Sequence, residues 1–335
     1  MSTLLASSLF LAVFVRPACC FESVNLLQQK IVLAAPDAPE TQLLRAAEPL
    51  YWVHFPKCGS SFMNTLAHMP GFCPPLSNMT LNWTSLGICM LMTWSQNCQN
   101  WCDADKLACD KIPHRPILNY SERRGHMVGF FRDPDQRILS GYYDETEPFA
   151  SVLSQLTAPW MIGVADLIVA TGYCNKDLRY LIVGLPKVPL LEFAEGWKGG
   201  MTYQLVTEDD HGIPTVTPNR TKVTPADGLE AARRVREGFA FVGITEEWDL
   251  SICLFHRMLG GPCLGSDFED TRPSSPGKSA HSGYNTSVLM GWHDDIDEIV
   301  YEAALEVFHK NLVLYNVSHD TCQECYRNAG IGDFA

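Results

Sequence analysis

The sequence has little positive charge. Its 335 residues include 25 Lys and Arg against 38 Asp and Glu, so the formal net charge at pH 7 is −13. Non-specific binding to nucleic acid needs an excess of Lys and Arg that neutralises backbone phosphates. This composition excludes a general nucleic-acid binder, whereas a local basic pocket for a small anion remains compatible with it.

The N-terminal apolar run is too short to span a bilayer as a helix. It covers residues 4–15, whereas a transmembrane helix needs about 20 apolar residues. Small residues follow it near Cys20, so we predict a signal peptide at residues 1–20, although no Lys or Arg precedes the run. The alternative is a short signal-anchor that would hold the protein at a membrane.

The rest of the chain contains no recognisable linker or internal repeat. No long Gly/Ser-rich or Pro-rich run interrupts residues 48–330. The chain is 46% hydrophobic, which is sufficient for one large core. We therefore predict one domain at residues 48–325, with a Cys-rich insertion at about 71–111.

Cysteines and glycosylation sequons both indicate an oxidising lumen, so we expect a secreted or Golgi-lumenal glycoprotein. The sequons are Asn78, Asn82, Asn119, Asn219, Asn285 and Asn316, and the cysteines of the insertion are Cys73, Cys89, Cys98, Cys102 and Cys109.

Near the C-terminus, Cys322 and Cys325 form a CxxC pair without a second CxxC or a suitably spaced His pair. We predict a disulfide there and no metal site, while a redox pair or half a zinc site are the alternatives.

Apolar segments that alternate with helical ones predict an α/β fold with a mainly parallel central sheet. The expected strands lie at 49–55, 126–131 and 239–243. In such sheets, ligands bind beyond the carboxyl ends of the strands.

Helix signals occupy much of the sequence between and after these strands. Thr224 and Pro225 predict a helix start. Thr245 and the two glutamates after it predict a capped helix after the third strand. Apolar residues from Ile296 to Phe308 form one stripe of a long helix. Residues 151–170 predict two helices broken at Pro159.

The first chemical motif is HFPKCGSSF at 54–62, where a strand ends, a small-residue loop turns and a helix begins. Free backbone N–H groups, hydroxyls and Lys57 suit a phosphate or sulfate, and Gly59 permits close backbone approach. The sequence lacks the Walker A pattern of a P-loop kinase, because its Lys precedes the only Gly. The plainer alternative is a helix start without a ligand.

The second motif is FRDPDQRILSGYY at 131–143. Arg132 ends an apolar strand, and Ser140 lies about two helical turns further on. A guanidinium and a hydroxyl are suitable ligands for a terminal phosphate. The alternative is a surface Arg132 paired with Asp133 and a helix-facing serine.

Together with FVGITEEW at 241–248, these motifs resemble the PAPS-dependent carbohydrate sulfotransferases, where PAPS is 3′-phosphoadenosine-5′-phosphosulfate. The heparan and uronyl 2-O-sulfotransferase branch is the most similar in motifs. The resemblance implies a P-loop-kinase-like three-layer fold and sulfuryl transfer to a carbohydrate hydroxyl without a metal. The alternative is an inactive relative that only binds a nucleotide or glycan.

The resemblance also assigns residues. The 5′ end of PAPS would be held by Lys57, Cys58, Gly59, Ser60, Ser61 and Phe62. Arg132 and Ser140 would bind the 3′-phosphate, and Lys278, in a basic segment at 272–281, would cover the cofactor unless that segment is an ordinary solvated loop.

Lys57 would also be catalytic, and a general base is expected between the two PAPS motifs. We predict His114, which lies 18 residues before Arg132 in a segment leading to the site. His126 and Glu122 are alternatives. His68, three turns along the first helix, is expected to lie too far away.

Overall fold

The computed structural model describes residues 39–77, 98, 100–109, 114–146, 189–208, 222–270 and 283–332. The chain divides into two units, Met1–Pro39 and Glu40–Ala335, and the sheet and the candidate site belong to the second. Three predictions lie outside the described residues: the signal peptide at 1–20, the helices at 151–170 and the role of Lys278.

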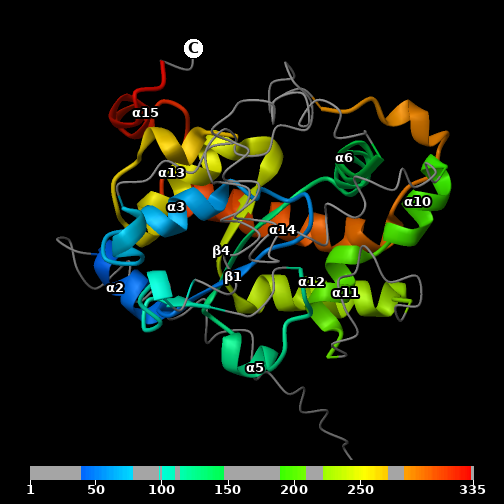
Figure 1. Ribbon diagram of the computed structural model, residues 1–335, viewed down its shortest axis with the longest axis horizontal. Coiled ribbons are helices and arrows are strands. Elements are labelled where there is room, and N and C mark those ends of the chain that lie inside the picture. The colour runs from blue at the N-terminus through cyan, green and yellow to red at the C-terminus, as the bar shows by residue number, and fades with distance from the viewer. Residues whose placement is uncertain are drawn as a thin grey trace, which may run out of the picture. The chain divides into compact units, whose positions relative to one another are not determined.

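Four parallel strands form the centre of the second unit (Figure 1). They are β1 (Leu50–Val53), β2 (Leu107–Ala108), β3 (Met127–Phe131) and β4 (Phe239–Ile244), and their order in the sheet is β2-β1-β3-β4. This confirms the predicted α/β class and parallel sheet. The short edge strand β2, inside the Cys-rich segment, was not predicted.

β3 and β4 are buried along their whole length. Their sequences, MVGFF and FAFVGI, are continuous apolar runs, as expected for strands covered on both faces. On one face, Phe62 from α3 (Phe62–His68) and Phe255 from α13 (Trp248–Leu259) pack against Phe241, with ring centroids 5.7 and 5.1 Å away. Figure 1 shows α3 and α13 to the left of the strands, and α11 and α12 to their right.

The other described helices connect and cover these strands. Before β4 they are α2 (Pro39–Ala47), η1 (Pro74–Leu76), α5 (Tyr120–Arg123), α6 (Pro134–Thr146), α10 (Leu190–Trp197), α11 (Gly200–Val206) and α12 (Pro225–Gly238). After β4 they are η2 (Thr245–Glu247), α13, η3 (Gly265–Phe268), η4 (Thr286–Leu289), α14 (Asp295–Leu314) and α15 (Gln323–Ala329). α10 and α11 lie within residues 171–222, where no helix or strand is predicted.

Two predicted helix starts have different outcomes. Thr224 caps α12 as predicted, because its side chain accepts from Asp227 N while the Asp227 carboxylate accepts from Thr224 N. The predicted cap at Thr245 is wrong. The Thr245 hydroxyl instead donates to the carbonyl of Phe131 at 3.0 Å, and a 3₁₀ turn precedes α13. Thr245 therefore joins β4 to the end of β3.

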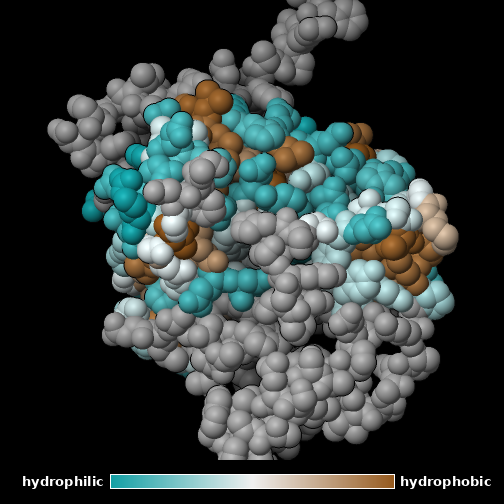
Figure 2. Space-filling view, turned by 90° about the horizontal axis from the view of Figure 1, so that it is seen from above, coloured by the Kyte–Doolittle hydropathy of each residue, from teal (hydrophilic) through white to brown (hydrophobic). Residues whose placement is uncertain are grey.

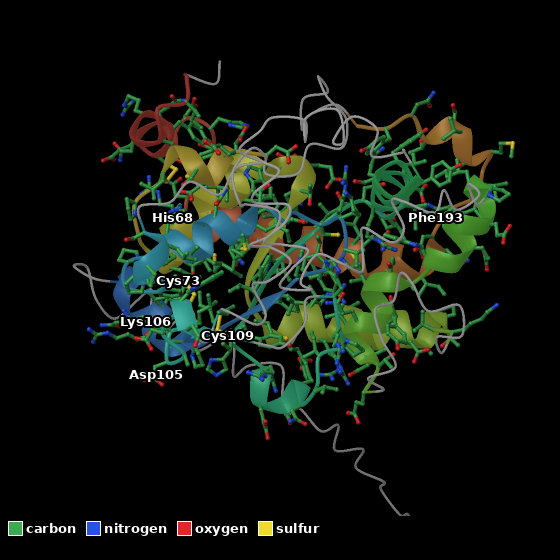
Figure 3. The ribbon with its side chains drawn as sticks, viewed as in Figure 1. His68, Cys73, Asp105, Lys106, Cys109 and Phe193 are labelled. Atoms are coloured by element: carbon green, nitrogen blue, oxygen red, sulfur yellow. A yellow bond between two sulfur atoms is a disulfide. The ribbon has the colours of Figure 1, made fainter. Side chains whose placement is uncertain are left out.

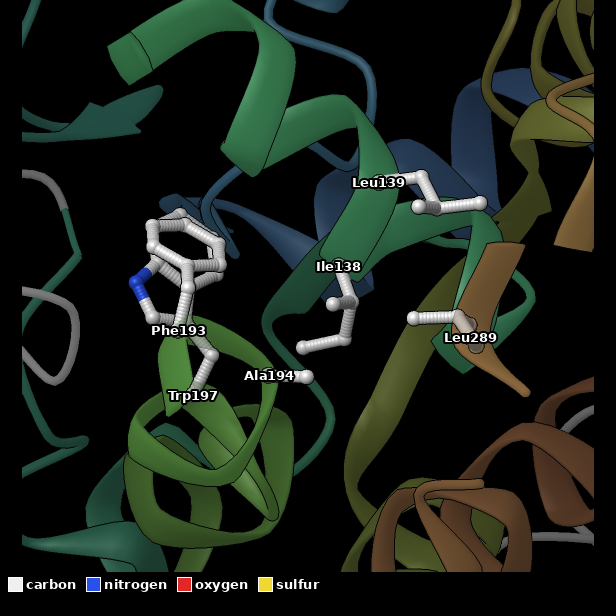
Figure 4. Close-up of a cluster of buried hydrophobic side chains, with 6 residues drawn as sticks. All are labelled: Ile138, Leu139, Phe193, Ala194, Trp197 and Leu289. Atoms are coloured by element: carbon white, nitrogen blue, oxygen red, sulfur yellow. The ribbon is translucent and has the colours of Figure 1, made fainter. Parts of the chain in front are cut away.

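A satellite apolar cluster packs α6 against α10 and η4 (Figure 4). Ile138 and Leu139 on α6 face Trp197 on α10 and Leu289 on η4. The cluster fixes the helix that follows Arg132. The described residues that are visible in Figure 2 are mainly hydrophilic, with apolar patches between them.

Four disulfides cross-link the described residues, and their pairs are Cys73–Cys102, Cys98–Cys109, Cys253–Cys322 and Cys263–Cys325. The first two confirm that disulfides hold the Cys-rich segment. The predicted disulfide between Cys322 and Cys325 is wrong. Cys322 bonds Cys253 of α13, and Cys325 bonds Cys263 in the loop after α13. These bonds are consistent with a secreted or lumenal protein. None of the described helices is both long and apolar enough to cross a membrane.

Candidate functional site

Three motifs meet at the carboxyl edge of the sheet. The lysine loop, which we define as residues 54–61, follows β1, Arg132 follows β3, and residues 245–248 follow β4. These strands are adjacent and parallel, so their ends lie at one edge. The Arg132 guanidinium donates from Nη1 to the carbonyl of Lys57 at 3.1 Å, although 75 residues separate them. The two anion motifs are therefore in direct contact.

The lysine loop has an unusual backbone. Lys57 and Gly59 adopt φ values of 67° and 74°, in the left-handed region that lysine rarely occupies. A Cβ on Gly59 would lie 2.8 Å from Trp248 and 3.1 Å from Phe130, so glycine is needed for space as well as for φ. Within the described part of the chain, the N–H groups of Gly59 and Ser60 donate no hydrogen bond. The loop thus presents adjacent backbone donors beside a lysine.

Two of the predicted loop ligands point inward. The Cys58 thiol is buried against Met201, and burial raises its pKa to about 12. The Cys58 N–H donates to the carbonyl of Phe55. The Phe62 ring lies in the core between the sheet and α13. Lys57, Gly59, Ser60 and Ser61 remain as the predicted residues that line the loop itself.

A histidine whose role was not predicted is the first residue of the lysine loop. His54 Nε2 lies 3.1 Å from the Ser60 hydroxyl. Its ring stacks on Trp52 at 4.4 Å and meets the ring of His114 at 4.5 Å. The structure therefore brings the predicted base, His114, to the loop through His54. Its position at the end of the first strand was the signal in the sequence that could have identified His54.

Besides the Lys57 carbonyl, the Arg132 side chain contacts Glu246 and Tyr284. Its Nε lies 3.7 Å from Glu246 Oε1, and its guanidinium carbon lies 5.7 Å from the centroid of the Tyr284 ring. Nε itself is buried without a hydrogen-bond partner among the described residues. The alternative pairing with Asp133 is not found, because Asp133 Oδ1 accepts from Gln136 N at the start of α6. Arg132 is thus oriented while one donor remains unsatisfied.

Glu246 is itself fixed by two donors. Its Oε1 accepts from Asp133 N at 3.3 Å, and its Oε2 accepts from the Tyr301 hydroxyl at 3.3 Å. Partial burial raises its pKa, against the opposing effect of Arg132. The sequence predicts helix capping for the glutamates of FVGITEEW, whereas in the structure Glu246 lies beside Arg132.

Ser140 lies on α6 and is fully buried. Its hydroxyl has no hydrogen-bond partner among the described residues. A buried hydroxyl without a partner is uncommon in proteins. The predicted phosphate contact would satisfy it, but in this conformation Ser140 is not exposed.

A buried ionic cluster of Arg137, Asp294 and Asp297 lies behind the lysine loop. Arg137 Nη2 lies 3.0 Å from Asp297 and 3.5 Å from Asp294, and all three side chains are at most 1% exposed. Asp297 also accepts from the N–H groups of Met201 and Thr202. Met201 touches Cys58, so this cluster connects α6, α11 and α14 with the lysine loop, a connection for which the sequence contains no local signal.

The cluster contains two carboxylates, Asp294 and Asp297, and only one guanidinium, that of Arg137. Burial, and then the neighbouring Asp297, raise the pKa of Asp294 to about 7, although Arg137 acts in the opposite direction. Asp294 therefore carries a proton over part of the neutral pH range.

The alternative bases lie elsewhere. His126 precedes β3, at the amino end of the strand, where its Nδ1 lies 3.0 Å from the carbonyl of Ala47. Glu122 lies on α5, before the same strand end. His68, at the end of α3, lies on the side of Cys73 and Cys109 in Figure 3. Of the four candidates, His114 is the one whose ring contacts His54 of the lysine loop among the contacts of the described residues.

In the described part of the chain, no group of three His, Cys, Asp or Glu side chains gathers as metal ligands would. No family model matches the chain, and no curated protein or solved structure matches it either.

Proposed function

We propose that this protein is a PAPS-dependent sulfotransferase that transfers a sulfuryl group to a carbohydrate hydroxyl by in-line displacement. The contact between Arg132 and Lys57 is the observation that carries the proposal. PAPS has a phosphosulfate at its 5′ end and a phosphate at its 3′ end. A protein that binds both ends needs two anion-binding groups close together, and this contact joins two such groups.

The donors at the strand ends suit these anions. Lys57 and the N–H groups of Gly59 and Ser60 would hold the 5′-phosphosulfate. The unsatisfied Nε of Arg132 would face the 3′-phosphate, with Ser140 as a further donor. The proposal also includes a P-loop-kinase-like fold and a location in the Golgi lumen. Lys278 would cover the bound PAPS.

Catalysis would follow from positioning and charge. PAPS, when bound, supplies the sulfuryl group and a phosphate leaving group. Lys57 and the loop N–H groups would stabilise the negative charge that develops on the departing phosphate oxygen. His114 would take the proton of the acceptor hydroxyl while the new S–O bond forms and the old one breaks.

We expect Arg132→Ala to weaken the binding of 3′-phosphoadenosine-5′-phosphate, the product of the donor, by about 10- to 100-fold. Hydrogen bonds to charged groups contribute about 1.5–3 kcal/mol, which corresponds to this range. Isothermal titration calorimetry of the full chain would measure the dissociation constants. Adenosine 5′-monophosphate, which lacks the 3′-phosphate, should bind equally to both proteins.

Arg236→Ala is the matched control, because Arg236 is an exposed arginine paired with Glu306 at 2.7 Å, away from the strand ends. It should bind the nucleotide like the wild type. If Arg132→Ala bound 3′-phosphoadenosine-5′-phosphate with unchanged affinity, the assignment of the 3′-phosphate site would be wrong.

The activity is tested by incubating the wild-type protein with sulfur-labelled PAPS and a panel of glycans. We expect label on at least one glycan, in the presence of EDTA as well as in its absence. Nucleotide binding without transfer to any glycan or other hydroxyl acceptor would identify the inactive binding relative instead. Absence of nucleotide binding would reject both the sulfotransferase and a relative that binds a nucleotide.

A further inference from the structure

The ring of His54 contacts two neighbouring rings and one hydroxyl. It is only 5% exposed, stacks on Trp52, contacts the tilted ring of His114, and places Nε2 3.1 Å from the Ser60 hydroxyl. Its main-chain carbonyl accepts from the Gln204 side chain at 3.0 Å. These contacts hold the ring where Nε2 lies beside the Ser60 hydroxyl.

A serine hydroxyl carries one proton and two lone pairs. When His54 Nε2 carries a proton, it donates to Ser60 Oγ, and the Ser60 proton remains available for a ligand. When Nε2 lacks a proton, Ser60 must donate to the ring and loses that donor. The protonation of His54 at Nε2 thus decides whether Ser60 donates to an anion in the loop.

We infer that His54 is a positioning residue that directs the Ser60 hydroxyl toward the 5′-phosphate of the bound nucleotide. This inference rests on the proposed function, since it assigns the 5′ end to the lysine loop. His54 Nε2–H donates to Ser60 Oγ, and Ser60 O–H donates to a phosphate oxygen. The chain of two hydrogen bonds polarises the serine and strengthens its bond to the departing phosphate.

His54→Phe and His54→Gln separate this role from packing. Phenylalanine keeps an aromatic ring in contact with Trp52 and His114 but has no hydrogen-bond donor. Glutamine loses the ring but places an amide N–H near the position of Nε2. We expect His54→Phe to weaken binding of 3′-phosphoadenosine-5′-phosphate by about 3- to 10-fold, the range of one neutral hydrogen bond. His54→Gln should recover most of that loss.

A double-mutant cycle with Ser60→Ala tests whether His54 acts through the serine. The double variant His54→Phe/Ser60→Ala should bind no more weakly than Ser60→Ala alone. Adenosine 3′-monophosphate, which lacks the 5′-phosphate, should bind all variants equally. His309→Phe applies the same chemical change at an exposed position of α14 and should leave binding unchanged.

Circular dichroism and the melting temperature verify that each variant is folded. If His54→Phe does not fold, His54→Leu, which also lacks a hydrogen-bond donor, takes its place in the cycle. Additive losses, an equal loss for phenylalanine and glutamine, or an equal loss with adenosine 3′-monophosphate would each overturn the inference. A wild-type protein that binds none of these nucleotides would instead reject the proposed function.

Discussion

Replacing Lys57 with alanine is expected to lower the turnover number for sulfuryl transfer by about 10²–10³-fold or more, the loss typical of removing one preorganised group that stabilises transition-state charge. Lys57 is the cationic side chain of the lysine loop, and its carbonyl accepts from Arg132. Its charge would act on the departing phosphate oxygen. The measurement is the initial rate of label transfer at saturating PAPS, with nucleotide affinity determined in parallel.

The left-handed backbone of Lys57 allows the charge to be separated from the conformation. At a φ of 67°, alanine is strained much as lysine is, whereas glycine adopts this region without cost. Lys57→Ala and Lys57→Gly should therefore lose turnover equally, although the glycine variant relieves the strain. A glycine variant with near wild-type turnover would show that the loop backbone, and not the ammonium group, supports catalysis.

The sequence predicted the parts of the fold that depend on local pattern. Continuous apolar runs identified β1, β3 and β4, and the Thr224 cap identified the start of α12. The strand β2 was missed because its two residues carry no periodicity. The Cys322–Cys325 pair was misjudged because sequence spacing does not determine disulfide connectivity.

The candidate site was also predictable only where its residues follow a local pattern. The residues of the lysine loop and of the Arg132 motif could be named from the sequence, because each follows an apolar strand and precedes a helix. The contacts made with residues far along the chain could not be named, and these include Glu246 and Tyr284 beside Arg132. His54 is an intermediate case, since it lay within the quoted motif but only the folded chain shows its contact with Ser60.

Asp297→Asn is expected to lower the free energy of unfolding by about 3 kcal/mol, because it removes the buried carboxylate that lies nearer to Arg137 and leaves one buried backbone N–H group without its acceptor. Both Asp297 oxygens accept from backbone N–H groups, those of Met201 and Thr202. An asparagine must therefore turn its NH₂ group toward one of these donors. Chemical denaturation of the disulfide-intact protein would measure the change.

Asp294→Asn is the matched comparison and should cost only about 1 kcal/mol, near the value of one hydrogen bond. Its oxygen can take the place of Oδ1 and keep the bonds from Gly199 N and Asp297 N, while its amide group takes the place of Oδ2, which lies 2.9 Å from Gly199 N and 3.5 Å from Arg137. Asparagine also resembles the protonated form that the raised pKa of Asp294 favours.

The same raised pKa predicts how this comparison changes with pH. Between the usual pKa of an aspartate and about 7, the folded state holds a proton on Asp294 that the unfolded chain has released. The contribution of Asp294 to stability must then fall as pH rises through this range. Asp294→Asn has no such group, so its stability relative to the wild type should improve from pH 5 to pH 8. A difference that stayed constant, or moved the other way, would show that Asp294 remains ionised in the folded cluster, and Asp294→Asn should then be about as destabilising as Asp297→Asn.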